Sequence, residues 1–104
     1  MADPKTDATR KLLAAVWEKN LPIVRERVEQ LASIVTLVQA KVLDSGQREA
    51  GIATAHKLAG SLGMFGYTEG TAAARAIEQA LDEDTIDPNH LSAELTKLRA
   101  ALPL

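Results

Sequence analysis

Apolar residues recur at helical spacing along most of the chain. The longest run lies between Ile23 and Leu43, where apolar positions follow each other three or four residues apart. The positions are Val24, Val28, Leu31, Val35, Val38 and Val42. Such spacing places them on one face of a helix about six turns long. Valine favours strands, but the run lacks period-two alternation and is much longer than a strand. We therefore predict a helix over 23–43.

Proline and glycine separate this run from further helical segments. A first helix is predicted from Asp7 to Asn20, and Pro22 is placed in the first turn of the helix that follows it. The breaking signal at Ser45 and Gly46 precedes a helix over 47–65. The two remaining segments begin at Thr68 and at Asp87-Pro88 and are predicted over 68–81 and 88–102.

The short connections imply that consecutive helices are antiparallel neighbours. We therefore expect an all-α fold, an up-and-down antiparallel four-helix bundle with an additional short N-terminal helix packed across one end. No repeat, linker or low-complexity segment interrupts the pattern. A single domain over residues 1–104 is expected.

The composition of the chain is useful mainly because it excludes several classes of function. Charged residues make up 25% and hydrophobic residues 46%, which indicates a globular chain. Without cysteine there is no thiolate ligand or nucleophile, and we expect no metal and no cofactor on this chain. A net charge of −2 argues against nucleic-acid binding. No apolar run suits a membrane span and the N-terminus is polar, so we expect a cytoplasmic monomer.

His56 is the residue best placed for chemistry. On a helical wheel the apolar face of the 47–65 helix centres on Ala55, Leu58 and Leu62, and His56 lies about 120° away on an exposed flank. The other histidine, His90, falls in the first turn of the last helix, and we interpret it as incidental. The stripe shared with His56 carries mostly small residues, namely Ile52, Ala53, Ala59, Gly60 and Gly63.

Glycine within a helix costs about 0.5–1 kcal/mol relative to alanine, so Gly60 and Gly63 need a reason. Three interpretations remain open. The glycines leave room for a bulky partner to reach the imidazole, or they allow close helix packing, or Gly63 marks an early helix end.

The stretch AHKLAGSLGMFG, followed by a helix with AARAIEQAL, resembles the signature of histidine-containing phosphotransfer (HPt) domains. The matching residues are His56, Leu58, Gly60, Ser61 and Gly66, with the acidic Glu78 on the next helix. The resemblance covers the whole bundle in length and helix order. Its specific part is the histidine helix and the turn after it.

The chain differs from many HPt domains in the position of one basic residue. Many HPt domains carry a lysine three residues after the histidine, and here that position is Ala59. Lys57 follows the histidine directly, about 100° around the helix, on a stem long enough to approach a phosphoryl group. The resemblance leaves open which cation assists transfer.

The resemblance implies a phosphorelay intermediate of two-component signalling rather than an enzyme with its own kinase domain. His56 would be the phosphoacceptor, since a neutral imidazole nitrogen has a lone pair for attack on phosphorus. The implied partners are a response-regulator receiver domain and a hybrid histidine kinase, and Mg²⁺ is expected on the receiver. Residues expected to dock the partner or support the phosphoryl group are Ile52, Ala53, Lys57, Ala59, Gly60, Gly63 and Met64.

Other classes of protein fit less well. A non-catalytic helical adaptor that binds a signalling partner is the main alternative, and only His56 speaks against it. A bundle that binds a cofactor through His56 and His90 would need inward carboxylates, but the predicted seams are apolar. A kinase dimerisation domain would normally precede an ATP-binding domain, for which 104 residues leave no room.

Overall fold

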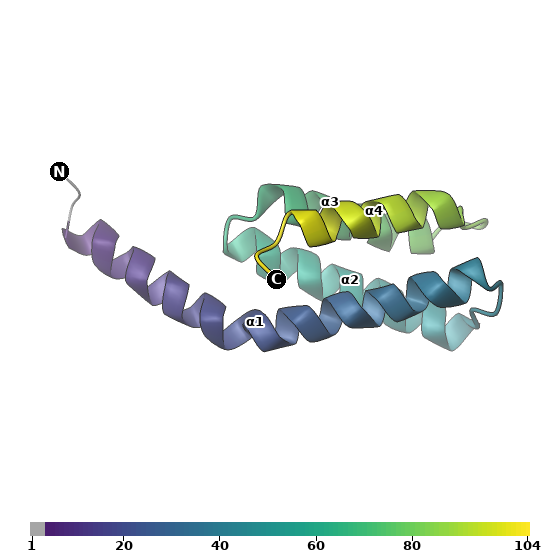
Figure 1. Cartoon of the computed structure of the whole chain (residues 1–104), viewed down its shortest axis with the longest axis horizontal. Coiled ribbons are helices and arrows are strands. Elements are labelled where there is room, and N and C mark those ends of the chain that lie inside the picture. Colours follow the sequence, from purple (N-terminus) through teal and green to yellow (C-terminus); the bar gives the residue numbers. More distant parts are fainter. Residues whose placement is uncertain (1–3) are drawn as a thin grey trace.

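The computed structural model describes residues 4–104, with side chains from Asp7 onward, and this range contains four helices and no strand. The helices are α1 (Pro4–Gln39), α2 (Ser45–Met64), α3 (Thr68–Leu81) and α4 (Pro88–Ala100). Each helix packs against the next one along the chain, and α4 closes the bundle against α1 (Figure 1). The predicted all-α class and antiparallel up-and-down order are confirmed.

The prediction of a separate short N-terminal helix is wrong. The segments predicted over 7–20 and 23–43 belong to the single 36-residue helix α1, which contains Pro22 in its interior. A proline inside a helix removes one hydrogen-bond donor, and its ring crowds the carbonyl oxygen four residues earlier. This bends the helix without necessarily ending it. Figure 1 shows the bend where α1 leaves the bundle.

Aromatic packing anchors α1 on the N-terminal side of Pro22. The ring of Trp17 meets Phe65 edge-on at a centroid distance of 5.1 Å and lies 4.6 Å from the ring of Tyr67. These three are the only aromatic residues of the chain, and Phe65 and Tyr67 belong to the turn between α2 and α3. Helical residues on both sides of Pro22 thus contact the rest of the bundle, Trp17 before it and Val24 after it.

The predicted seam of α1 forms one wall of the core. Its first five members are buried, namely Val24, Val28, Leu31, Val35 and Val38. Val42, predicted as the sixth, is instead 61% exposed. The reason is that α1 ends at Gln39 and Lys41 adopts a left-handed backbone with φ of 60°, which turns the chain away from the bundle.

Both ends of α2 are defined by local signals in the sequence. Asp44 and Gln47 form a reciprocal capping box, in which the Gln47 N–H donates to Asp44 Oδ1 (2.7 Å) and the Asp44 N–H donates to Gln47 Oε1 (3.0 Å). Ser45 and Gly46 therefore lie inside the first turn of α2 rather than before it. At the other end Gly66, with φ of +81°, reverses the chain toward α3.

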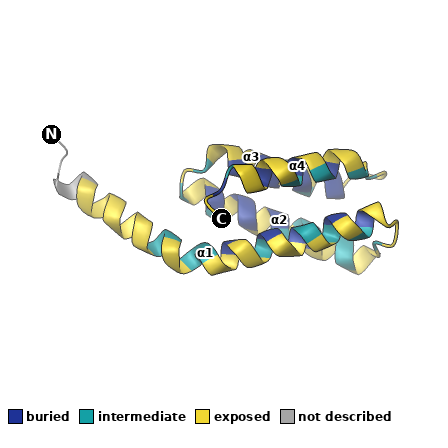
Figure 2. Ribbon diagram, viewed as in Figure 1, coloured by how far each residue is buried: buried dark blue, intermediate teal, exposed yellow. Residues whose placement is uncertain are grey.

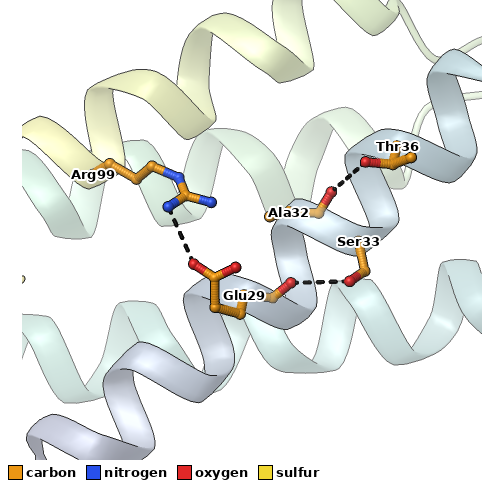
Figure 3. A network of polar contacts seen from close by, with 5 residues as sticks. All are labelled: Glu29, Ala32, Ser33, Thr36 and Arg99. Atoms are coloured by element: carbon orange, nitrogen blue, oxygen red, sulfur yellow. Dashed lines mark hydrogen bonds and ion pairs between the residues drawn. The ribbon is translucent and has the colours of Figure 1, made fainter.

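Polar contacts join the helices at the surface. Arg48 of α2 donates to the carbonyl oxygens of Leu81 (2.6 Å) and Glu83 (2.9 Å), so a cation covers the C-terminus of α3. Arg99 of α4 donates to Glu29 of α1 at 3.1 Å (Figure 3), an exposed pair of the kind that contributes about 0–1 kcal/mol.

Burial is concentrated in the four-helix part of the molecule. Figure 2 shows the interior faces of the bundle buried, whereas the N-terminal section of α1 that extends beyond it is exposed. Along the part of the chain that the structure describes, no helix is both long and apolar enough to cross a membrane.

Replacing Pro22 tests this view of α1. Pro22→Ala should raise the free energy of unfolding by about 1–3 kcal/mol, because alanine restores a backbone donor within a continuous helix. Pro88→Ala is the matched control and should change stability little, since Pro88 occupies the first turn of α4. Thermal melts followed by circular dichroism measure both. A lower melting temperature for Pro22→Ala would mean that the bundle requires the bend.

Candidate functional site around His56

His56 stands on the exposed side of α2 and points toward α3. Its side chain is 76% exposed, and its Nδ1 lies 2.9 Å from Oε1 of Glu78 on α3. The apolar positions Ala55, Leu58 and Leu62 are fully buried on the other side of the helix. The predicted exposure of His56 is therefore confirmed.

The pairing with Glu78 follows from the register of two antiparallel helices. A Cβ added at Gly51 would lie 3.0 Å from Cδ1 of Leu81, and one added at Gly63 would lie 3.8 Å from the side chain of Thr71. Between these two close approaches, each step toward the C-terminus of α2 is matched by a step toward the N-terminus of α3. This register brings His56 and Glu78 together.

The hydrogen bond determines which ring nitrogen is free. An ionised carboxylate only accepts hydrogen bonds, so the Nδ1–H of His56 donates to Glu78. In the neutral imidazole Nε2 then carries the lone pair. None of the described residues forms a hydrogen bond or ion pair with this atom. The arrangement presents a nucleophilic nitrogen to solvent on an oriented ring.

An open pocket of about 400 Å³ lies between α2 and α3 beside the imidazole. The lining residues from α2 are Ile52, His56, Ala59 and Gly60, and those from α3 and its C-terminal end are the polar residues Arg75, Glu78, Gln79 and Asp82. The histidine therefore borders a space that a substituent on its ring can enter.

Most of the predicted docking residues surround His56 at the surface. Ala53, Lys57, Gly60, Gly63 and Met64 are exposed, and Ile52 is half-buried. Ala59 differs, because it is 4% exposed and belongs to the core. The wheel placed Ala59 on the exposed stripe, but α3 packs over that edge of α2. Ala59 contributes to the pocket wall and offers almost no surface to a partner.

The structure decides some of the interpretations of the two glycines near His56. A Cβ added at Gly60 would meet nothing within 4 Å, so the packing interpretation is wrong for this residue and the space around it is open. Gly63 does not mark an early helix end, since α2 continues through Met64. A Cβ there would make only ordinary contact with Thr71, at 3.8 Å.

The remaining candidate residues take no part in this site. His90 is exposed near the start of α4 and lines none of the space beside His56. Ser61 accepts a hydrogen bond from Nη1 of Arg27 at 3.2 Å, which links α2 to α1. Within the described residues, no group of three or more His, Cys, Asp or Glu side chains is arranged to hold a metal ion.

Two polar residues of α3 were missed as site residues. Glu78 entered the sequence comparison only as a matching acidic position, and Arg75 was not considered. Both lie on the same face of α3, three residues apart, and both border the pocket beside His56. The amphipathic pattern of α3 could have indicated this face, but not which residue of α2 it opposes.

The fold and the site together define a helical bundle with an exposed histidine on one helix that is hydrogen-bonded to a carboxylate of the next. The family model of the Hpt domain matches residues 13–101. The chain therefore belongs to the Hpt domain family, whose members carry phosphoryl groups on histidine in two-component signalling and are not kinases. No curated protein and no solved structure gives a significant match.

The open surroundings of Gly60 predict its effect on stability. Gly60→Ala should raise the free energy of unfolding by up to about 1 kcal/mol, because alanine favours helix and meets no neighbour. Gly51→Ala is the matched control on the same helix and should lower it, since its Cβ would press on Leu81 at 3.0 Å and on Ile34 at 3.3 Å. Urea unfolding of the two variants provides the comparison. If Gly60→Ala lowered the free energy of unfolding, the space around Gly60 would not be open.

Proposed function

We propose that this chain is a phosphorelay intermediate that accepts a phosphoryl group on Nε2 of His56 from the aspartyl phosphate of a receiver domain. It then passes the group to an aspartate of another receiver. The observation that carries the proposal is the exposed imidazole whose Nδ1 is bonded to Glu78 and whose Nε2 is free. Family membership supplies the reaction class.

The transfer is a substitution at phosphorus. The lone pair of Nε2 attacks, the N–P bond forms, and the P–O bond to the aspartate breaks, so that the aspartate leaves as a carboxylate. The proton on Nδ1 stays in place throughout. The imidazole ring gains positive charge as the bond forms, and the carboxylate of Glu78 lies 2.9 Å from Nδ1 to stabilise it. Return of the group to a receiver reverses these steps.

Phosphoryl transfer depends mostly on positioning and on charge stabilisation. In this proposal the receiver brings its acidic pocket with Mg²⁺, and the present chain brings the nucleophile and a docking surface. That surface consists of the exposed or half-exposed residues around His56: Ile52, Ala53, Lys57, Gly60, Gly63 and Met64. A hybrid histidine kinase would supply the first phosphorylated receiver.

The direct test is phosphorylation of His56. Receiver domains charged with radiolabelled acetyl phosphate should label the chain, and the label should be lost in acid and kept in base, as for an N–P bond. His56→Gln should abolish the label and leave the melting temperature unchanged, because the side chain is exposed. His90→Gln is the matched control and should be labelled like the unaltered chain.

Labelling that persists in His56→Gln would show that another residue is the acceptor. A chain that binds receivers but takes no label from any of them would favour the alternative function, a non-catalytic helical adaptor. Either outcome would overturn the proposed function and leave the description of the fold unaffected.

Substitutions of Glu78 test how the ring is oriented. Glu78→Ala should slow labelling by about 10-fold or more, because the ring loses its hydrogen-bond acceptor and the charge that stabilises the product. Glu78→Gln should retain part of the rate, since its amide oxygen still accepts from Nδ1. Rates come from rapid-quench single turnovers. If Glu78→Ala and the unaltered chain transfer equally fast, Glu78 does not position the acceptor.

A further inference from the structure

A phosphoryl group on His56 would enter surroundings that are short of positive charge. The group carries a charge of about −1.5 to −2 at neutral pH. The pocket beside His56 is lined by the carboxylates of Glu78 and Asp82, and Glu78 is already engaged with Nδ1. Stabilisation of the phosphoryl oxygens during transfer therefore calls for a cation close to Nε2.

Arg75 is the cation that lines this pocket. It precedes Glu78 by three residues, so the two side chains share a face of α3 and are separated by about 4.5 Å along its axis. The register that pairs His56 with Glu78 places Arg75 opposite Ala59. The guanidinium thus comes from α3 to the turn of α2 that follows the histidine.

The side chain of Arg75 has no competing partner among the residues that the structure describes. It is exposed and forms no hydrogen bond or ion pair with any residue that the structure describes. Three other arginines are engaged, since Arg27 donates to Ser61, Arg48 to the carbonyl of Leu81, and Arg99 to Glu29. Arg75 also borders a second hollow, of about 250 Å³, near Gly63 and Gly66. Its guanidinium is therefore available to move toward a new anion.

The α2 side of the pocket leaves room for that movement. A Cβ at Gly60 would meet nothing within 4 Å, and the buried Ala59 contributes only a methyl group. Lys57 is less well placed, because it lies about 100° around α2 from His56 and does not line the pocket. Arg75, unlike Lys57, lines the space that a phosphoryl group on the ring can enter.

We propose that Arg75 binds the phosphoryl group on His56, its guanidinium reaching across Gly60 to hydrogen-bond phosphoryl oxygens during transfer. A planar guanidinium can donate two parallel hydrogen bonds to a phosphate, which lysine cannot do. The inference rests on the proposed function, since it assumes that His56 accepts the group. It goes beyond that function by assigning the cation to α3 rather than to the histidine helix.

The test uses the receiver domain that labels the unaltered chain, in single turnovers over a range of receiver concentrations. Arg75→Gln should lower the maximal rate at saturating receiver by about 10- to 100-fold, because a charge-assisted hydrogen bond made in the transition state is lost. The half-saturating concentration should change less than threefold. Arg75→Lys should recover part of the maximal rate, since it restores the charge without the paired donors.

Arg25→Gln is the matched control, an exposed arginine of α1 that does not line the pocket, and its maximal rate should stay within about twofold of that of the unaltered chain. Circular dichroism melts should be unchanged for all three variants, because both side chains are exposed. An unchanged maximal rate in Arg75→Gln would overturn the inference. So would a loss confined to the half-saturating concentration, which would make Arg75 a docking residue, or an equal loss of maximal rate in Arg25→Gln.

Failure of this inference can be told apart from failure of the proposed function. If the unaltered chain is never labelled on His56, the proposed function fails. If His56 is labelled and Arg75→Gln transfers at the full maximal rate, only the role of Arg75 is refuted.

Discussion

The close antiparallel packing of α2 against α3 sets the geometry on which the rest of the site depends. Small residues allow the approach, since a Cβ at Gly51 would press on Leu81 and one at Gly70 would lie 3.2 Å from the side chain of Leu62. The register fixed by these contacts places a carboxylate of α3 at Nδ1 of His56. The same register brings Arg75 of α3 to the pocket beside the imidazole. The proposed nucleophile, orienting group and cation thus all depend on the packing of one helix pair.

Glycine serves opposite purposes on the two sides of α2. Toward the core, at Gly51, the missing side chain lets α3 and α1 approach, and a methyl group there would require the side chains of Leu81 and Ile34 to shift. Toward solvent, at Gly60, nothing occupies the space, and the helix is less stable there than it would be with alanine. No packing contact offsets this loss of up to about 1 kcal/mol, which fits the proposal that Gly60 leaves room for a receiver domain.

The sequence predicts features that depend on the geometry of a single helix, but not features that depend on how two helices pack. The exposure of His56 and the burial of Leu58 follow from local helical geometry, so the wheel placed both correctly. The burial of Ala59 and the bond from His56 to Glu78 depend on the register with α3, which no single-helix pattern contains. Continuation through Pro22 depends on Trp17 packing against the distant turn between α2 and α3, so the local signal to end the helix was misleading.

The central claim is that Glu78 holds the imidazole so that Nε2 is the atom that accepts phosphorus. The most direct measurement is ¹⁵N NMR of the phosphorylated chain with labelled histidine, in which coupling to phosphorus and the correlations to the ring protons identify the phosphorylated nitrogen. The account predicts phosphorus on Nε2 of His56, with the proton retained on Nδ1. Phosphorus on Nδ1 would contradict it, because that nitrogen could not then donate to Glu78.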